Sequence, residues 1–456
     1  MLFASSTKHE MYDFATNTWS TPHNMVQPRA NVKAATSGGK SYFAGGGFIG
    51  VSSYAFYKNV DIYNASTNTW TTTNLSAARI VGASAAIGNK VLFAGGRQIL
   101  NYSKVVDIFD VTTGIRTTHN LSQARSGMAV AVVGSKVIFA GGEAGNISSG
   151  IYTESNKVDI YDDATGTWST AILAAKREQI TVAVVGTKVL FAGGITPSGL
   201  YSNLIDIYES TTNTWTTKFL SETKYGMSAA TVDTKVYFVG GMVDNTGVIS
   251  NKVEIYNSVT NAKQIITISS PRMNMAVAQT PGRVMFAGGI VTWGNVGTDR
   301  IEVLNIATNT WTVEYLSRPR LNLASASYGN KAMFAGGAEV LSSYPQYSVI
   351  SKRVDIWTDP VPIAKLNANV IGAISATSLT FKVYPNPFVD RITIELSNSD
   401  QPVSIEIYDI LGKLNSSYQL TDMKNELNLS ELTSGIYFIK LSAGQQVLDT
   451  VRMIKQ

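Results

Sequence analysis

A short motif recurs along most of the chain at a nearly constant spacing, and this repeat limits the possible folds more than any other feature. The motif is Phe-Ala/Val-Gly-Gly, and its first glycines are separated by 50, 46, 52, 47, 48 and 48 residues. These glycines are Gly45, Gly95, Gly141, Gly193, Gly240, Gly288 and Gly336. A period of about 50 is typical of propeller blades and is longer than the repeats of helical solenoids. We therefore expect a radial array of small sheets.

Each repeat predicts four antiparallel strands, and no segment has convincing helical periodicity. A strand of small residues, such as ASAAI from Ala83, ends in a two-residue turn where glycine and asparagine accept a positive φ. A KVLFAGG-like strand, a loop of variable length, a VDIY-like strand and a TNTW turn follow, and the last strand opens at the tryptophan. The repeat region is therefore predicted to be all-β, with few exposed strand edges because the sheets repeat radially.

Residue size within each repeat fits this geometry. The first strands are rich in alanine, serine and glycine, as expected where strands converge on an axis and large side chains would collide. The phenylalanine of each second strand is expected to fill the wedge between neighbouring sheets. These residues are Phe43, Phe93, Phe139, Phe191, Phe238, Phe286 and Phe334.

A tyrosine and a tryptophan stand seven residues apart in several repeats, namely Tyr12/Trp19, Tyr63/Trp70, Tyr161/Trp168 and Tyr208/Trp215. Together with the double glycine after a hydrophobic strand, this spacing resembles the Kelch repeat, and the resemblance covers residues 1–359. It implies a β-propeller, and six complete repeats plus one composite repeat predict seven blades, with six or eight blades as alternatives. Arg116 and Lys263 occupy the tryptophan position in two repeats, where we expect weaker packing at the outer edge.

The ends of the repeat region bear on how the ring closes. Residues MLFASS align with a second strand, with Ser5 and Ser6 in place of the glycines, so the chain begins inside a blade. The last repeat reaches Trp357 and then meets Pro360 and Pro362, which stop a regular strand. We expect the first residues to supply the outer strand or strands that the last blade lacks. The same alignment predicts a truncated start.

A different pattern follows the repeats. A linker of small and apolar residues covers 360–378, and residues 379–456 read as short alternating strands separated by turn residues, which predicts a small β-sandwich. This segment resembles the type A C-terminal sorting domain of the bacterial type IX secretion pathway. The resemblance rests on Tyr384, Pro385, Asn386, Pro387, Gly412, Lys413, Gly435 and Tyr437, and on a basic end with Arg452 and Lys455.

The sorting resemblance implies a destination. It implies export across the inner membrane by a signal peptide, then passage across the outer membrane with the type IX secretion machinery as the partner. The protein is thus expected outside the cell or on the outer-membrane surface. The opening residues MLFASSTKHE have no basic segment followed by a long apolar one, so the signal peptide is missing from this sequence. No apolar run is long enough to be a transmembrane segment.

A base recurs nine residues after each tryptophan position, and the predicted fold brings these bases to one face. They are Arg79, Arg125, Arg177, Lys224, Arg272 and Arg320, with Arg29 one residue late in the first unit. Loops of the same face carry the aromatic candidates Tyr102, Tyr152, Tyr201, Trp293 and Tyr347. In Kelch relatives, arginines at this point of the repeat line the mouth that receives acidic peptides. Such a basic ring with aromatic surroundings suits an anionic or glycan ligand.

The same bases also have a purely structural interpretation. An acid precedes each base by eighteen residues, so a ring of ion pairs that holds the blades in register would explain both residues without a ligand. The acids are Asp61, Asp107, Asp159, Asp206, Glu254 and Glu302. A second ring of bases falls at hairpin turns of the opposite face, where we expect solvated side chains. Its members are Lys40, Lys90, Lys136, Lys188, Lys235, Arg283 and Lys331.

Composition narrows the remaining function classes. The net charge is +5, but the bases alternate with acids instead of lining a groove, so no nucleic-acid partner is predicted. The chain has no cysteine, and its three histidines show no metal-ligand spacing. No cofactor, no metal and no catalytic residue is therefore predicted.

Three functions remain, and one of them is purely structural, with the propeller serving as a surface spacer or adhesive. The first is a secreted or cell-surface binding protein whose propeller loops present a face to an extracellular glycan or protein. The alternative is a sugar-active, mutarotase-like enzyme at the central mouth of the propeller. An enzyme predicts one deep pocket where an acid and a base converge, whereas a binding protein predicts aromatic residues spread over an open face.

Overall fold

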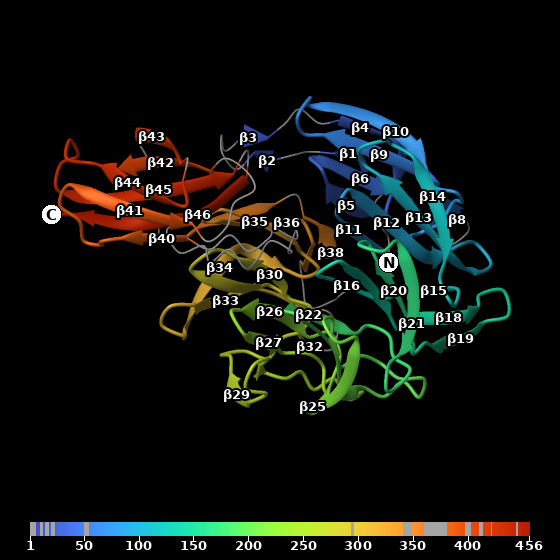
Figure 1. Ribbon diagram of the computed structural model, residues 1–456. Coiled ribbons are helices and arrows are strands. Elements are labelled where there is room, and N and C mark those ends of the chain that lie inside the picture. Colours follow the sequence, from blue (N-terminus) through green and yellow to red (C-terminus); the bar gives the residue numbers. More distant parts are fainter. Residues whose placement is uncertain are drawn as a thin grey trace. The chain divides into compact units, whose positions relative to one another are not determined.

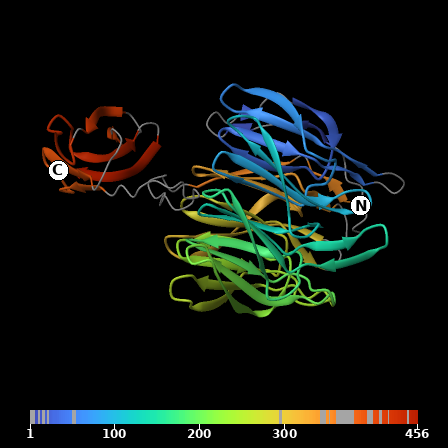
Figure 2. The same ribbon diagram turned by 45° about the vertical axis from the view of Figure 1, so that its right-hand side comes forward.

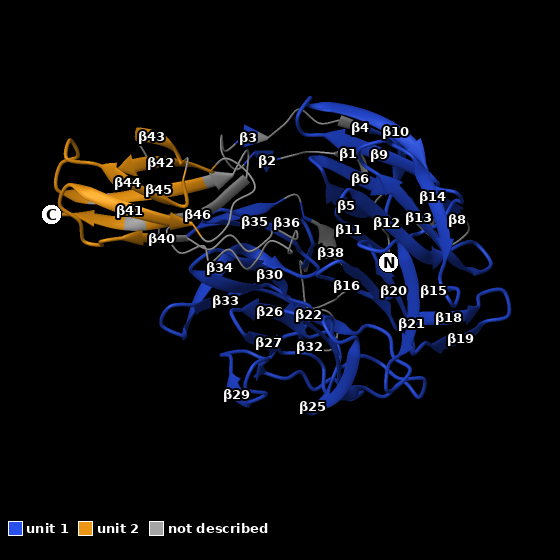
Figure 3. Ribbon diagram, viewed as in Figure 1, with its two compact units in different colours: residues 1–361 blue, residues 362–456 orange. Residues whose placement is uncertain are grey.

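The structure is a computed structural model, and it describes residues 6–9, 12–13, 18–19, 23–49, 54–292, 296–340, 348–351, 353–359, 381–396, 403–409, 414–420, 422–443 and 446–456. None of these residues lies in a helix, and so none of them belongs to a helix that could cross a membrane. The chain forms two compact units, residues 1–361 and residues 362–456 (Figure 3), and each is described by itself. The predicted linker at 360–378 lies outside the described residues.

The described part of the first unit contains seven antiparallel sheets of one pattern, which we number repeat sheets 1 to 7 in chain order (Figure 1). Sheets 1 to 3 comprise β5 (Lys33–Ser37), β6 (Lys40–Ala44), β9 (Asn59–Asn64) and β10 (Thr69–Asn74); β11 (Ala83–Ile87), β12 (Lys90–Arg97), β13 (Tyr102–Asp110) and β14 (Arg116–Asn120); and β16 (Ala129–Val133), β17 (Lys136–Ala140), β20 (Lys157–Asp162) and β21 (Thr167–Ile172).

Sheets 4 to 7 repeat the pattern, although the last has three described strands. They comprise β22 (Thr181–Val185), β23 (Lys188–Ala192), β24 (Ser202–Glu209) and β25 (Thr214–Lys224); β26 (Ser228–Val232), β27 (Lys235–Val239), β28 (Lys252–Asn257) and β29 (Lys263–Thr267); β30 (Ala276–Gln279), β31 (Arg283–Ala287), β33 (Val296–Asn305) and β34 (Thr310–Arg320); and β35 (Ala324–Tyr328), β36 (Lys331–Ala335) and β39 (Val354–Thr358).

The first strands of consecutive sheets lie against one another, as the small residues predict for strands near an axis (Figures 1 and 2). Hydrogen bonds also join them: the Ser84 hydroxyl on β11 donates to the carbonyl of Ala34 on β5 at 2.8 Å. Six hydrophobic clusters each unite two consecutive sheets. Phe139, for example, is fully buried against Leu92 and Val106 of sheet 2. The wedge role of the second-strand phenylalanines is therefore confirmed where these clusters contain them.

The tyrosine and tryptophan of the repeat lie directly opposite each other on the third and fourth strands, as in Tyr208 and Trp215. Their ring centroids are 5.0 Å apart. The Tyr208 hydroxyl also donates to Asn213 at 2.7 Å, and this asparagine has a φ of 55° in the TNTW turn. The recurring pattern thus fixes both the strand register and the turn.

Short strands complete the first unit. At the N-terminus, β1 (Ser6–His9) pairs with β4 (His23–Arg29), and β2 (Tyr12–Asp13) pairs with β3 (Thr18–Trp19). Among the described residues, no strand pairing joins these four strands to β39. Closure of the ring by the first residues, and with it the blade count, therefore stays a prediction.

The remaining short strands lie in the loops between second and third strands or beside them. They are β7 (Gly47–Ile49), β8 (Tyr54–Phe56), β15 (Arg125–Ser126), β18 (Glu143–Asn146), β19 (Ile151–Glu154), β32 (Ile290–Thr292), β37 (Ala338–Val340) and β38 (Ser348–Ile350).

The second unit consists of two packed sheets. One has the order β40 (Phe381–Tyr384), β41 (Arg391–Leu396) and β44 (Lys424–Asn428). The other has the order β43 (Leu414–Leu420), β42 (Val403–Asp409), β45 (Gly435–Ala443) and β46 (Gln446–Lys455). Alternate residues of both sheets, such as Ile394, Ile405 and Ile439, form one buried core, as expected for a sandwich.

Candidate functional site

The loops between second and third strands and the linkers that lead from a fourth strand to the next sheet meet on one face, which we call the loop face. In each repeat, the residue after the linker base forms an antiparallel bridge with the residue after the double glycine. The bridged pairs are Ala30/Gly47, Ile80/Arg97, Ser126/Glu143, Glu178/Ile195, Tyr225/Met242, Met273/Ile290 and Leu321/Ala338. The loop face is therefore built by the same contact seven times over.

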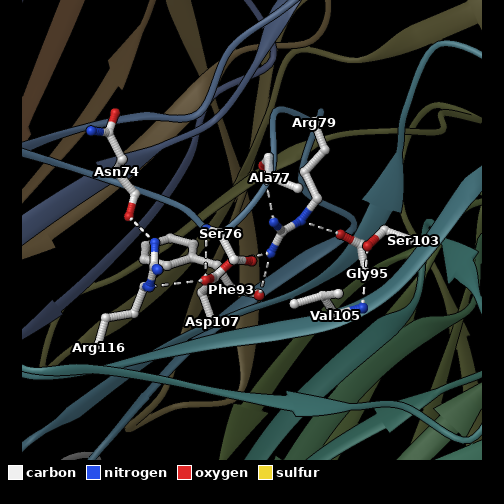
Figure 4. Close-up of polar contacts among 10 residues, drawn as sticks. All are labelled: Asn74, Ser76, Ala77, Arg79, Phe93, Gly95, Ser103, Val105, Asp107 and Arg116. Atoms are coloured by element: carbon white, nitrogen blue, oxygen red, sulfur yellow. Dashed lines mark hydrogen bonds and ion pairs between the residues drawn. The ribbon is translucent and has the colours of Figure 1, made fainter.

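The linker bases lie beneath this face, and Figure 4 shows one of them, Arg79, in its surroundings. Its Nη2 donates to Asp107 Oδ2 at 2.7 Å and to the carbonyl of Phe93 at 3.0 Å. Its Nε donates to the carbonyl of Gly95 at 2.9 Å. Asp107 also accepts hydrogen bonds from the backbone and the hydroxyl of Ser76. Arg79 and Asp107 are both 0% exposed.

The same pairing recurs around the described ring, and every base is buried. The pairs are Arg29–Asp61, Arg79–Asp107, Arg125–Asp159, Arg177–Asp206, Lys224–Glu254, Arg272–Glu302 and Arg320–Asp355. Six of the acids also accept a hydrogen bond from the backbone amide three residues before their base, for instance from Ser122 to Asp159 at 2.8 Å. These contacts are those of the structural interpretation, and they leave the base head groups no exposed surface.

The partner of each base differs from the one that the sequence spacing indicated. The acid eighteen residues before Arg79 is Asp61, which pairs with Arg29 instead. Each base pairs with the acid that follows it, 28 residues later for Arg79 and 35 for Arg320. The reason is that the base sits in the linker that enters a sheet and packs against the second and third strands of that sheet. The earlier acid belongs to the sheet before.

Burial dominates the electrostatics of these bases. It lowers the pKa of Arg125 and Arg177, and the charges of Asp159 and Asp206 oppose that effect. Burial lowers the pKa of Arg272 to about 10, so this guanidinium also stays charged at neutral pH. Removing one partner of such a pair leaves an uncompensated buried charge, which costs about 3 to 5 kcal/mol. We conclude that these bases hold consecutive sheets in register.

The two repeats without tryptophan place a base near the same buried acid. Arg116 lies 3.6 Å from Asp107 and donates to the carbonyl of Asn74 at 2.7 Å. Lys263 lies 2.8 Å from Glu254. The ring contacts that tryptophan makes elsewhere are thus replaced by ion pairs in these two sheets.

The second ring of bases, on the opposite face, also connects sheets. Lys90 of sheet 2 lies 2.5 Å from Asp163 in the turn of sheet 3, and Lys40 of sheet 1 donates to the carbonyl of Val111 in the turn of sheet 2. Arg283 of sheet 6 lies 3.5 Å from Asp359 after β39. The expectation of solvated turn side chains was wrong for these bases, because the adjacent sheet lies within reach of their head groups.

The aromatic candidates differ in exposure. Tyr152 on β19 is 50% exposed, whereas Tyr102 at the start of β13 is 6% exposed and its hydroxyl bonds to Glu143. Tyr201 is half-buried, and its ring centroid lies 4.5 Å from that of Tyr225. Trp293 and Tyr347 lie outside the described residues. Tyr152 thus presents the most open aromatic surface among the described candidates.

The bridge positions of the loop face escaped the sequence reasoning, although each immediately follows a base or a double glycine. Toward sheets 5 to 7 they are apolar, and Met242, Met273, Ile290 and Leu321 form one buried cluster. On sheets 2 to 4 one residue of each bridged pair is charged, namely Arg97, Glu143 and Glu178. The bridge positions of the loop face are therefore apolar near sheets 5 to 7 and include charged residues near sheets 2 to 4.

The charged part contains three carboxylates. Glu143 on β18 lies directly opposite Glu154 on β19, and like charges in such a cross-strand pair repel each other. Burial raises the pKa of Glu178, and the negative charges of Glu143 and Glu154 raise it further. These three carboxylates are partly exposed, in contrast to the buried linker bases.

The loop tips around these carboxylates are apolar. Six large hydrophobic side chains on four consecutive loops are each at least half exposed: Ile99, Leu100, Ile151, Tyr152, Leu200 and Val248. Hydrogen bonds tie the loops together in pairs, from the amide of Ser148 to the carbonyl of Leu100 at 3.2 Å and from Asn245 to the carbonyl of Gly199 at 3.4 Å. An open hollow of about 480 Å³ adjoins them, lined by Gln98, Asn101, Tyr102, Ser103, Lys104, Val105, Ala124 and Gly145. Among the described residues, no acidic or histidine cluster could hold a metal ion.

In the second unit, most of the sorting-motif residues gather near the final strand. The Asn386 side chain accepts a hydrogen bond from the amide of Ile454 at 2.9 Å, and Gly435 lies opposite Lys455. Tyr384, Pro385 and Pro387 are exposed, and the Tyr384 hydroxyl bonds to Glu395. Tyr437 is buried, and its hydroxyl donates to the carbonyl of Thr433 at 2.9 Å. Gly412 and Lys413 lie outside the described residues.

Lys455, from the basic end, is also buried. Its ammonium group lies 5.5 Å from the centroid of the Phe388 ring and 3.4 Å from Asp390. The motif that begins at Tyr384 and the end of the last strand therefore form one continuous structure.

Comparison with known proteins identifies both units. The model of the Kelch motif matches residues 124–171 and 223–262, and that of the secretion system C-terminal sorting domain matches residues 382–456. The chain is also similar to a solved structure titled "Structure of YjhT", with 14% identity and a TM-score of 0.43 over 61% of this chain and 98% of that one. No curated protein matches the chain. This all-β chain therefore combines a β-propeller of Kelch repeats with a C-terminal sorting domain of the type IX secretion system, which indicates a secreted or cell-surface protein.

Proposed function

We propose that this protein binds a glycan or another protein outside the cell through its loop face. In this proposal, residues 1–359 form the binding propeller, residues 360–378 a linker, and residues 379–456 the export signal that the type IX machinery reads. The Kelch repeats support a binding role, and the sorting domain supports export.

One observation carries the proposal: apolar side chains are exposed on four consecutive loops of one face, which hydrogen bonds join in two pairs. Other exposed apolar residues, such as Ile172 and Phe219, occur singly along fourth strands, where isolated exposure needs no explanation. A contiguous apolar patch with polar surroundings is typical of an interaction surface.

The exposure of the candidates suggests how they divide their roles. Tyr152 and Tyr201 can contact a ligand, and Trp293 and Tyr347 belong to the corresponding loops of later repeats. The linker bases are positioning residues, because their side chains are buried and paired. The open hollow suits a binding surface better than the deep pocket that a sugar-active enzyme would use.

The experiment compares two exposed isoleucines of the same repeat sheet. Ile151 is 65% exposed at a loop tip, and Ile172 is 61% exposed at the end of the fourth strand. Full-length protein is screened against glycan and protein arrays, and the recovered ligand is then measured with both variants. We expect Ile151→Asp to weaken binding about tenfold and Ile172→Asp to leave it unchanged. Equal binding by both variants would remove the loop face from the ligand site.

A further inference from the structure

The loop face combines an apolar surface with a group of three carboxylates, and this combination restricts the ligand. Among the bridge positions and the strand opposite them, Glu143, Glu154 and Glu178 carry negative charge and Arg97 carries positive charge, so three acids and one base give −2. Leu100, Ile151, Leu200 and Val248 stand exposed on the loops of sheets 2, 3, 4 and 5, respectively.

These carboxylates have polar neighbours but no ionic partner among the described residues. Tyr102 bonds to Glu143, and Gln179 bonds to Glu178. The buried bases that precede the bridge residues Ser126 and Glu178 pair elsewhere, since Arg125 pairs with Asp159 and Arg177 with Asp206. Glu143 and Glu154 therefore face each other across the strand pair, and neither makes an ion pair with a described residue.

We propose that the loop face of repeat sheets 2 to 5 docks an apolar segment of a partner protein that carries a lysine or an arginine. The cationic head group of the partner's lysine or arginine lies near Glu143, Glu154 and Glu178. The apolar residues beside it in the partner segment pack on the loop tips. This inference rests on the proposed function and specifies its partner as a protein with a basic, apolar segment.

Charge complementarity decides between the candidate partners. A cation near the three carboxylates relieves their mutual repulsion, whereas an acidic ligand adds to it and is excluded. A neutral glycan could stack on Tyr152 but would leave the repulsion unchanged. The apolar loop tips favour a partner with hydrophobic side chains, because the free-energy cost of their exposure to water is removed only when they are buried against apolar atoms.

The probe is a set of synthetic apolar peptides that differ only at a central residue, which is arginine, lysine, glutamine or glutamate. Binding to the full-length protein is measured by surface plasmon resonance. We expect the arginine and lysine peptides to bind and the glutamate peptide not to bind. In Glu143→Gln/Glu178→Gln protein, their affinity should fall about tenfold, as expected when a desolvated charge pair is lost.

The matched control is Lys176→Ala, which removes an exposed charge two residues before Glu178 on the same linker. This variant should bind the arginine peptide at least as tightly as the unchanged protein. Failure of every basic peptide to bind, equal binding of the glutamine peptide, or unchanged affinity in the Gln/Gln variant would each overturn the inference.

A second variant separates this inference from the proposed function. If Ile151→Asp abolishes binding of an array ligand while Glu143→Gln/Glu178→Gln does not, the loop face is a binding site but its partner is not selected by the carboxylates. If neither variant affects any ligand, the proposed function fails as well.

Discussion

Whether a charged residue at the loop face stabilises the fold or can contact a ligand depends on whether its head group is buried or exposed. Arg125 and Glu178 are within the third and fourth repeats, yet Arg125 is fully buried on Asp159 whereas Glu178 is half-buried beside other acids. The buried ion pair stabilises the folded protein only when both partners are present, because either one alone would be an uncompensated buried charge. The unpaired glutamate raises that free energy, which is the usual cost of a site held ready for a ligand.

The pH dependence of stability should distinguish two glutamates of this face. Burial and neighbouring acids raise the pKa of Glu178, so its favourable contribution exists at low pH, where it is protonated, and is lost as pH rises through its folded pKa. Burial alone would raise the pKa of Glu222, but hydrogen bonds from Lys252 and Ser250 lower it to about 2. The contribution of Glu222 is therefore present above its ordinary pKa of 4.5 and is lost as pH falls toward 2.

We accordingly expect Glu178→Gln to raise the melting temperature at neutral pH, with a gain that shrinks as the solution is acidified. Glu222→Gln should lower the melting temperature at neutral pH. Thermal melts of both variants across a pH series provide the measurement. A loss of stability in Glu178→Gln at neutral pH would show that its carboxylate is compensated in the folded state.

At the scale of elements, the sheets depend on packing between repeats more than on contacts within one. Each second-strand phenylalanine of the six clusters packs against the sheet before it, and each linker base binds the sheet after it. The double glycine also permits a close approach of the linker that enters the same sheet. At Gly142, with a φ of 95°, a Cβ would lie 2.3 Å from the carbonyl oxygen of Ser126.

Truncation of the wedge residue Phe139 on β17 should therefore be costly. We expect Phe139→Ala to lower the free energy of unfolding by about 3 to 5 kcal/mol, because it leaves a cavity between two sheets. Phe219→Ala is the control, since Phe219 is 59% exposed and its removal should change stability by less than about 0.5 kcal/mol. Urea unfolding measures both. Similar losses would mean that the sheets do not pack through the phenylalanine.

Substitutions at Gly142 and Gly150, two glycines of one loop, distinguish the cost of backbone strain from the cost of steric crowding. Gly150 also has a positive φ, 68°, but nothing lies within 4 Å of the position of its Cβ. Gly150→Ala should cost about 1 kcal/mol from strain alone, and Gly142→Ala should cost more because the Ser126 oxygen must move. Thermal melts compare the two, and an equal cost would show that the linker at Ser126 can move away from the double glycine without loss of stability.

At the scale of the whole molecule, the repeat period and the sorting motif were enough to predict the architecture. The glycine spacing and the tyrosine–tryptophan register depend on residues close together in the sequence, so the sequence alone predicts the strands and turns that they form. The partner of Arg79 was not predictable from spacing, because the acids before and after it are equivalent in sequence and only packing distinguishes them. The pairing of Glu143 with Glu154 was not predictable either, because it depends on the register of two short strands, β18 and β19, in a loop whose length varies between repeats.

The two units should be separable in function. Deletion of residues 379–456 should leave a propeller that still melts cooperatively, because its hydrophobic clusters contain no residue of the second unit. In its host, the shortened protein should remain in the periplasm, as fractionation and surface proteolysis would show. Normal delivery to the surface would contradict the sorting role.

The most direct test of the account measures melting temperature and ligand binding together for Arg125→Ala and Ile151→Asp. The buried base is assigned to stability and the exposed loop tip to binding. We expect Arg125→Ala to lower the free energy of unfolding by about 3 to 5 kcal/mol while the folded fraction binds normally. Ile151→Asp should bind about tenfold more weakly with an unchanged melting temperature. The reverse result, with Arg125→Ala stable but unable to bind, would contradict the account and return the linker bases to the ligand site.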